Sequence, residues 1–337
     1  MSVRASLFGL SVDEMSQTEA VETIQGIWRR GAKSRVFFVN AHCLNTASNC
    51  AEYRESLRRA EFLLPDGSGV LLASRMLHLP IRHNLNGTDL TPLLLKAAEE
   101  DGCSVFLLGA RPGIADLAAA SLRQRYPGLR IVGAQHGYFL PEETPAIIRR
   151  INAAQPDILL VAMGVPTQEL WITQHYNELQ VPVNLAVGAL FDFLSNSVPR
   201  APLVVRKVGM EWAFRLVCEP RRLWKRYLVG NFSFLFRVMA MRTGLKQAPA
   251  PVAVQMAMPE SGMRTHVPMR ITSATASYPR IPVPERGNIR WSAPPVRRGK
   301  APTVRLQSLA SLRAERRAAV PGSTPGTVER EPVPVSR

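Results

Sequence analysis

The stretch DILLVAMGVPTQELW, residues 157–171, contains the pattern on which the fold prediction rests. Its first part is a continuous apolar run, without the alternation of apolar and polar residues that a half-exposed strand shows. Gly164 and Pro166 then mark a tight turn, and a helical pattern follows with Thr167 in the capping position. We therefore predict a strand buried on both faces, a turn and a helix, which is the repeating unit of a parallel sheet.

The same unit recurs along the chain. Short apolar runs predict strands at residues 35–40, 61–65, 104–109, 129–135, 157–164 and 183–188. Helix-like stretches lie between them, at residues 41–60, 88–101, 113–126, 141–154 and 167–179. Buried strands that alternate with helices indicate an α/β fold with a Rossmann-like, mostly parallel sheet and helices on both faces. Sheets of this kind bind ligands at the carboxyl ends of their strands.

The net charge of +16 is carried by the C-terminal part of the chain. Residues 1–200 have a net charge of −1, residues 201–247 of +8 and residues 248–337 of +9. The last segment also holds 14 of the 27 prolines and lacks sustained apolar periodicity, so it cannot bury enough surface to offset its ordering entropy. We predict three parts: an α/β core (1–200), a basic amphipathic helical appendage that docks on a membrane (201–247), and a disordered Pro/Arg-rich tail (248–337).

A basic end of this kind implies an anionic partner, such as phosphates, a membrane surface or nucleic acid. Nucleic acid is disfavoured, because residues 248–337 contain only two aromatic side chains on which bases could stack, Tyr278 and Trp291. Residues 211–242 mix aromatic and cationic side chains, which is typical of docking on an anionic membrane surface and of diphosphate capture. The alternative interpretation is a core-packing helix with a solvated basic face.

A carboxylate, Asp66, follows the second predicted strand in the stretch EFLLPDGSGVLLASR, residues 61–75. Alone, this pattern fits a helix cap as well as a catalytic group. Turns with polar residues or glycines also follow other predicted strands, at Asn40, Gly109, Gly164 and Gly188. Because the carboxyl ends of parallel strands meet at one edge of a sheet, these groups are expected to converge there.

The sequence lacks the motifs of several other enzyme classes. It contains no GxxxxGK[ST] phosphate loop, no GxSxG nucleophile elbow, no HExxH zinc motif and no Asp-x-Asp metal clamp. Its four cysteines show no metal-ligand spacing and indicate free thiols in a reducing compartment. Neither a signal peptide nor an apolar run long enough to cross a bilayer is recognisable. A Rossmann-type nucleotide-binding oxidoreductase is the alternative function, although the glycine-rich dinucleotide fingerprint is missing.

Taken together, the motifs resemble one glycosyltransferase family. The order and spacing of the WecG/TagA/CpsF family (glycosyltransferase family 26) are matched by FVNAHCLNTA, LLPDGSGV, NGTDL, FLLGARPG, HGYF, PDILLVAMGVPTQELWI, VGALFDFLSN and EPRRLWKRYLVGN. The resemblance implies an inverting transfer of a sugar from a UDP-sugar donor to a polyprenyl-diphosphate-linked saccharide, in bacterial cell-surface or exopolysaccharide biosynthesis. The sugar would be of the N-acetylmannosamine type, its uronic acid, or glucose.

The resemblance also implies a setting for this reaction. It implies a Rossmann-like domain with a C-terminal helical appendage, and chemistry that needs neither a metal nor another cofactor. The protein would be cytoplasmic and peripherally associated with the inner face of the plasma membrane. Members of the family can self-associate, so a homo-oligomer is included among the expected partners, and nucleic acid is not.

Individual residues receive roles from the same resemblance. Asp66 would be the general base that deprotonates the acceptor hydroxyl on the face of the sugar opposite the leaving UDP. Asn40 would contact the sugar or its phosphate, and Gly67 would let the substrate approach closely. Residues near the sugar would be Asn86 and Asp89. Residues lining the uridine-diphosphate pocket would be Gly109, Arg111, Gly164, Gln168, Glu169, Gly188 and Asp192. Candidates for an appendage arginine that closes over the site are Arg221, Arg222 and Arg226.

Overall fold

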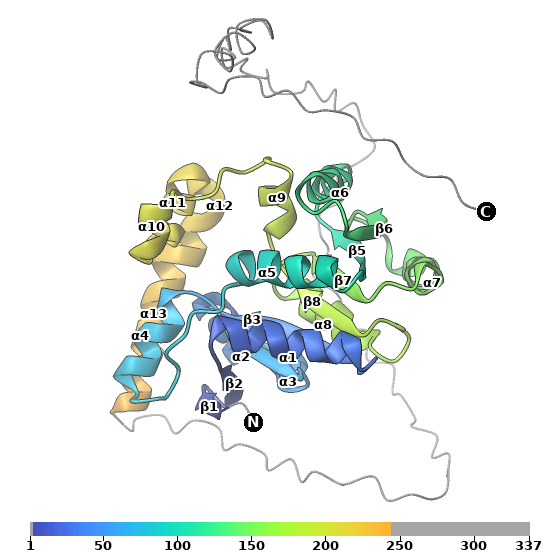
Figure 1. The fold of residues 1–337 in the computed structure, drawn as a ribbon. Helices are drawn as coiled ribbons and strands as arrows, with labels where there is room; N and C mark the ends of the chain where they lie inside the picture. The colour runs from blue at the N-terminus through green and yellow to red at the C-terminus, as the bar shows by residue number, and fades with distance from the viewer. Residues whose placement is uncertain (1–2, 244–337) are drawn as a thin grey trace, which may run out of the picture. The chain divides into compact units, whose positions relative to one another are not determined.

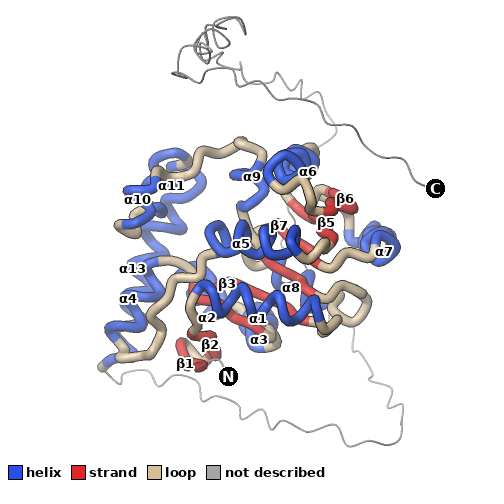
Figure 2. The backbone as a smooth tube through the Cα atoms, viewed as in Figure 1, coloured by secondary structure: helices blue, strands red, loops and turns tan. Residues whose placement is uncertain are grey.

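A six-stranded parallel sheet forms the centre of the protein (Figures 1 and 2). The computed structural model describes residues 3–243, so the predicted tail at 248–337 lies outside the described residues. The strands are β3 (Ser34–Val39), β4 (Phe62–Pro65), β5 (Ser104–Gly109), β6 (Arg130–Gln135), β7 (Ile158–Ala162) and β8 (Val183–Ala186). Their order is β4-β3-β8-β7-β5-β6, and all the pairings are parallel. All six predicted strands and the Rossmann-like α/β class are confirmed.

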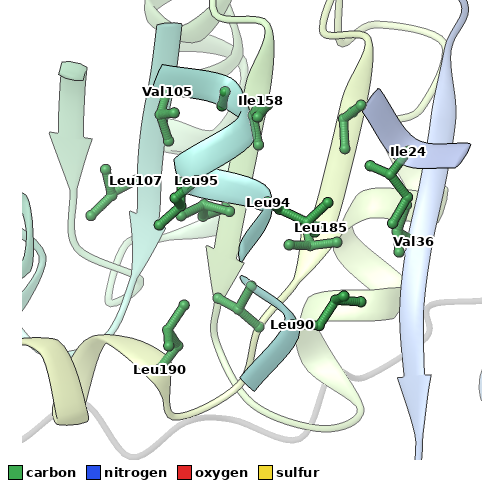
Figure 3. Packing of buried hydrophobic residues seen from close by; sticks show 14 of the residues in the cluster. Ile24, Val36, Leu90, Leu94, Leu95, Val105, Leu107, Ile158, Leu185 and Leu190 are labelled. Atoms are coloured by element: carbon green, nitrogen blue, oxygen red, sulfur yellow. The ribbon is translucent and has the colours of Figure 1, made fainter. Parts of the chain in front are cut away.

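The strands are apolar throughout because the sheet is buried on both faces. Successive residues of a strand point to opposite faces, so Val36 belongs to one core cluster and Phe37 to the other. The first cluster joins the sheet to α1 (Gln17–Arg29), α5 (Gly87–Glu100), α6 (Ile114–Arg125) and α9 (Leu190–Leu194). Figure 3 shows part of it, with Leu94 of α5 beside Leu185 of β8, and Ile24 of α1 beside Val36 of β3. The second cluster joins the sheet to α2 (Ala41–Asn49), α3 (Ala51–Arg58), α7 (Thr144–Ala154) and α8 (Thr167–Gln174).

Several elements differ from the predictions. The predicted helix at 41–60 is two helices, because the backbone of Cys50 is extended between α2 and α3. The predicted helix at 141–154 opens with a 3₁₀ turn, η1 (Pro141–Glu143). Elements that were not predicted are a hairpin of β1 (Val3–Leu7) and β2 (Leu10–Glu14), and helices α1, α4 (Ser68–Met76) and α9. A capping box of Ser16 and Glu19 marks the start of α1 and could have revealed it.

The C-terminal appendage is helical, as expected. It consists of α10 (Leu203–Lys207), α11 (Glu211–Cys218), α12 (Pro220–Trp224), the π-helical segment η2 (Lys225–Val229) and α13 (Gly230–Arg242). Helix α13 contacts α2 and α4, and Phe234 stacks on Phe8 with ring centroids 5.7 Å apart. Phe232 and Phe236 on the same helix are exposed, so α13 has a core-packing face and a separate apolar face. Among the described residues, none of the helices combines the length and the apolar character that crossing a bilayer requires.

Candidate active site

A cavity of about 370 Å³ lies where the strands β3, β4, β5, β7 and β8 end. Its wall includes the residues that follow these strands, together with two side chains from the appendage, Arg215 and Arg226. Of the predicted site residues, the cavity brings together Asn40, Asp66, Arg111, Gly164, Gln168, Gly188, Asp192 and Arg226. The convergence expected from the strand ends is therefore present, at the edge where α/β sheets bind ligands.

Asp66 is placed by the end of β4. Its backbone N–H donates to the carbonyl of Val39 at 2.9 Å, which continues the pairing of β4 with β3 by one residue. The helix-cap interpretation of Asp66 is wrong, because Gly67 occupies the cap position of α4 and no side chain caps that helix. Gly67 has a φ of 89°, a left-handed conformation that glycine adopts without strain. The turn thus leaves the Asp66 carboxylate free of a capping role and directs it to the cavity.

The pKa of Asp66 is raised above its usual value because burial disfavours its ionised form. Three neighbours oppose this effect: a hydrogen bond from Asn40 and the positive charges of Arg226 and Arg215. A carboxylate with a raised pKa binds a proton more readily than an exposed one, yet these donors keep the ionised form accessible. This combination suits a group that must accept a proton during a reaction near neutral pH.

Asn40 holds this carboxylate in place. Its Oδ1 accepts hydrogen bonds from the backbone N–H groups of His42 and Cys43, both at 3.1 Å, and so caps α2. Its Nδ2 donates to Oδ2 of Asp66 at 3.0 Å. Because the two N–H donors determine which end of the amide faces α2, the NH₂ group must face Asp66.

The Asn40→Asp variant tests this arrangement. An aspartate caps a helix as well as asparagine does, so α2 should keep its cap, and any loss of thermal stability at neutral pH should come from repulsion between the two carboxylates. It removes the donor to Asp66 and adds a like charge, so the pKa of Asp66 should rise further and kcat at neutral pH should fall about tenfold. In the pH profile of kcat, the acid limb should move to higher pH. Ser16→Asp, at the cap of α1, is the control, and an unmoved acid limb in Asn40→Asp would contradict the assigned contact.

Gln168 links two of the turns that line the cavity. Its Oε1 accepts hydrogen bonds from the backbone N–H of Gly164 at 3.2 Å and of Gly188 at 3.0 Å. These glycines follow β7 and β8, so one side chain holds two strand ends in register. The predicted cap at Thr167 is wrong, since Pro166 occupies the cap position of α8 and no side-chain hydrogen bond caps this helix.

Other predicted residues lie outside the cavity lining. They are Gly67, Asn86, Asp89, Gly109, Glu169 and Arg221. The side chain of Arg222 is outside what the structure describes. Arg221 is exposed, whereas Arg226 is partly buried and lines the cavity.

Asn86 and Asp89 connect the core to the start of the appendage. Asn86 caps α5 and donates through Nδ2 to Asp89 at 2.8 Å. Asp89 forms ion pairs with Arg200 and, at 3.2 Å, with Arg206. Burial raises the pKa of Asp89, but the hydrogen bonds from Asn86 and Arg200 outweigh it and the net shift is downward. Asn86 and Asp89 therefore anchor the appendage beside the cavity, through the ionised carboxylate of Asp89.

The prediction from sequence missed several lining residues. They include Gly87, Thr88, Tyr138, Phe193 and Arg215. The guanidinium of Arg215 lies over the ring of Phe193, 5.1 Å from its centroid, which connects α11 to α9. The mixture of aromatic and cationic residues in 211–242 was the available signal for Arg215, but it could not single out one arginine.

The fold and the cavity define the class: a Rossmann-like α/β protein with a polar ligand pocket at the carboxyl ends of its strands. Within residues 3–243, no group of His, Cys, Asp and Glu side chains is arranged to hold a metal ion. The particular family follows from comparison with known proteins. The chain belongs to the Glycosyl transferase WecG/TagA/CpsF family, whose model matches residues 5–248. Membership of a glycosyltransferase family replaces the oxidoreductase alternative.

Curated relatives are similar over most of the chain. The N-acetylglucosaminyldiphosphoundecaprenol N-acetyl-beta-D-mannosaminyltransferase of Staphylococcus aureus (strain NCTC 8325 / PS 47) is 29% identical over 253 residues, which cover 73% of this chain and 96% of the relative. The protein of the same name from Staphylococcus aureus (strain COL) matches with the same identity and coverage. The range matched by the family model, residues 5–248, contains the sheet, the cavity and the appendage.

Proposed function

We propose that this protein transfers a sugar, with inversion, from a UDP-sugar to a polyprenyl-diphosphate-linked saccharide. The observation that carries this proposal is a partly buried carboxylate, Asp66, in one cavity with two guanidinium groups, those of Arg215 and Arg226. A displacement of this kind needs a base for the incoming hydroxyl and positive charge for the departing diphosphate. Both requirements are met by groups of the cavity wall.

The reaction follows from these groups. Asp66 accepts the proton of the acceptor hydroxyl as its oxygen forms a bond to the anomeric carbon of the donor sugar. The bond from this carbon to the β-phosphate oxygen breaks on the opposite face, and UDP leaves with the bonding electrons. Arg215 and Arg226 stabilise the negative charge that develops on the diphosphate. The configuration at the anomeric carbon inverts because the displacement occurs in one step.

The arginines of the cavity wall support an anionic ligand. The Nε atoms of Arg215 and Arg226 are buried and have no hydrogen-bond partner among the described residues. Buried donors are normally paired, so unpaired ones next to a cavity favour a ligand that accepts hydrogen bonds. A diphosphate supplies such acceptors, and its binding by arginines would make a metal unnecessary. The cavity volume of about 370 Å³ is in the range of small-molecule sites.

The curated relatives narrow the substrates that we propose. Their name specifies transfer of an N-acetyl-β-D-mannosaminyl group to N-acetylglucosaminyldiphosphoundecaprenol. We infer a donor of the N-acetylmannosamine type, with its uronic acid and glucose as the other candidates, and an acceptor built on a polyprenyl diphosphate. The product would belong to a cell-surface polysaccharide or exopolysaccharide.

A donor screen tests the proposal. Purified protein is incubated with a polyprenyl-diphosphate-linked N-acetylglucosamine and one UDP-sugar at a time, and UDP release is measured with and without EDTA. We expect release with one of the three candidate donors, an inverted linkage in the product by NMR, and no effect of EDTA. UDP release that depends on an added nicotinamide cofactor would contradict the proposal. The absence of turnover with every UDP-sugar would also contradict it.

The exposed apolar residues of the appendage support docking on an anionic membrane surface. Val217, Phe232 and Phe236 are 80%, 75% and 73% exposed, and cationic residues occur on the same segments. Apolar side chains at this level of exposure are costly in water and gain free energy on entering the lipid interface. A lipid-linked acceptor also requires the cavity to lie close to the bilayer. We therefore propose peripheral association with the inner face of the plasma membrane.

Replacing both exposed phenylalanines, Phe232→Ser with Phe236→Ser, tests this surface. We expect partitioning onto vesicles of anionic phospholipid to fall at least about tenfold, because two aromatic rings no longer enter the lipid. Co-sedimentation measures it, and UDP binding should be unchanged. The matched control is Leu117→Ser with Leu140→Ser, two exposed leucines in the α/β part of the chain, outside the appendage. Unchanged co-sedimentation would contradict membrane docking by this surface. So would a variant that still binds vesicles but has lost the ability to form a dimer.

A further inference from the structure

A buried pair of side chains lies directly behind the cavity. Glu169 is 0% exposed and Gln168 is 3% exposed, although they are neighbours at the start of α8. Nε2 of Gln168 donates to Oε1 of Glu169 at 2.8 Å. Gln168 lines the cavity, but Glu169 does not, so the carboxyl group reaches the site only through the amide.

The orientation of the Gln168 amide matters to the cavity. Its Oε1 accepts from the N–H groups of Gly164 and Gly188, and both glycines line the cavity. A flipped amide would place an NH₂ group against these two donors and lose both hydrogen bonds. Glu169 opposes the flip, because its Oε1 accepts from the NH₂ group on the other side. The carboxyl group thereby maintains the shape of two turns that it does not touch.

The surroundings of Glu169 favour its neutral form. Burial raises the pKa of Glu169 to about 7, and the hydrogen bond from Gln168 opposes this only in part. Its Oε2 has no hydrogen-bond partner in the described part of the chain. Burial raises the pKa values of Cys43 in α2 and Tyr53 in α3, and the charge of Glu169 raises both further. The cation that acts on both of these groups is Arg226, which lines the cavity.

We propose that Glu169 is a positioning residue for the sugar-nucleotide donor: it fixes the Gln168 amide from behind, and binding of the nucleoside diphosphate draws a proton onto it. This inference rests on the proposed function, because it takes the ligand to be UDP. An ionised Glu169 would place a negative charge behind an anion site in a medium of low dielectric constant. The diphosphate therefore binds the neutral form more tightly, and by linkage its binding favours protonation.

Calorimetry of UDP binding to the full-length protein provides the test. Titrations near pH 7 in two buffers with different protonation enthalpies measure the number of protons taken up. We expect the wild-type protein to take up as much as about half a proton per UDP, since Glu169 is then partly ionised before binding. Glu169→Gln keeps an acceptor for Gln168 but cannot titrate. It should bind UDP within about threefold of the wild type and take up correspondingly less proton.

Two further variants separate positioning from general packing. Glu169→Leu keeps the volume but removes the acceptor, so Gln168 is released and the Kd for UDP should rise about tenfold, with a matching rise in the donor KM and a smaller change in kcat. Ser56→Ala removes a hydroxyl that donates to the backbone carbonyl of Glu169 at 2.9 Å. It disturbs the same helix without touching the amide–carboxyl pair, and its Kd should match that of the wild type.

The outcomes are distinguishable. Equal proton uptake by the wild type and Glu169→Gln would overturn the coupling, and an unchanged Kd in folded Glu169→Leu would overturn the positioning role. If Glu169→Leu does not fold, the Glu169→Gln comparison still decides the coupling to proton uptake, without which the proposal falls. A wild-type protein that binds no UDP at all would contradict the proposed function itself, and this inference would fall with it.

Discussion

Asp66→Asn is expected to lower kcat about a thousandfold while UDP binds within about threefold of the wild-type affinity, since general-base groups contribute on the order of 10²–10⁴ in rate. The asparagine has nearly the same shape and can still pair with Asn40 after rotation of its amide. It cannot accept a proton, so the acceptor hydroxyl would attack without a base. Single-turnover kinetics with the donor identified by the screen measure the chemical step, and calorimetry measures UDP binding.

The stability of this variant gives an independent check. Because the pKa of Asp66 is raised in the folded protein, the folded state binds the proton more tightly than the unfolded chain does. The contribution of Asp66 to the free energy of unfolding is fully present below its pKa in the unfolded chain. It is lost as the pH rises through its pKa in the folded protein. At neutral pH the ionised carboxylate is therefore destabilising, and Asp66→Asn should unfold at the same or a higher temperature than the wild type.

Asp116→Asn is the control for this substitution, because Asp116 is exposed on α6 and outside the cavity. It should leave both kcat and the unfolding temperature unchanged. Near-normal turnover by Asp66→Asn would remove Asp66 from the role of base. Loss of UDP binding together with turnover would instead assign it to the donor pocket.

Arg226→Ala should lower kcat/KM for the donor about a hundredfold, the second-largest effect that we expect. A charge-assisted hydrogen bond to a diphosphate contributes about 1.5–3 kcal/mol, and the alanine also removes the stabilisation of the leaving group. Arg226 also lowers the pKa of Asp66, so its loss should raise that pKa. A base with a higher pKa stays protonated, and therefore inactive, up to a higher pH. The acid limb of the pH–rate profile should therefore move to higher pH.

Arg221→Ala distinguishes between the arginines of the appendage. Arg221 is exposed and does not line the cavity, so its loss should reduce kcat/KM far less than the loss of Arg226. The same pH profile, measured on both variants, shows whether the effect passes through Asp66. An equal loss in the two variants would mean that the appendage adopts a different arrangement when substrate is bound.

The sheet could be predicted because its strands carry their signal locally. An apolar run such as 158–162 indicates a buried strand even when its neighbouring strands are unknown, since burial on both faces requires apolar residues at every position. The β1–β2 hairpin has no comparable signal: it is short, and only part of it is buried. Part of its stability comes from Asp13, which accepts the backbone N–H of Leu63 at 2.8 Å. That contact joins positions 50 residues apart in the chain, and no local pattern reveals it.

The candidate site could be predicted in part. Asn40 and Asp66 follow directly from strand ends, and both line the cavity. The sequence could not show which of Gln168 and Glu169 lines the cavity, because both are polar and both lie at the start of the same helix. Successive helical residues point about 100° apart, so one faces the cavity and the other faces the interior. The choice between Arg221 and Arg226 similarly depends on how the π-helical segment η2 and its flanking helices pack on the core.

From its sequence alone, this protein is determined to be a parallel α/β protein with polar groups at the carboxyl edge of its sheet, including Asp66 in a glycine turn. Those features arise from residues adjacent in the chain, where periodicity and turn chemistry are sufficient. Only the tertiary structure decided that Asn40 orients Asp66, that Arg215 and Arg226 join it, and that Glu169 lies behind the cavity. Each of these depends on distances between side chains from separate elements, which the packing of the whole core sets.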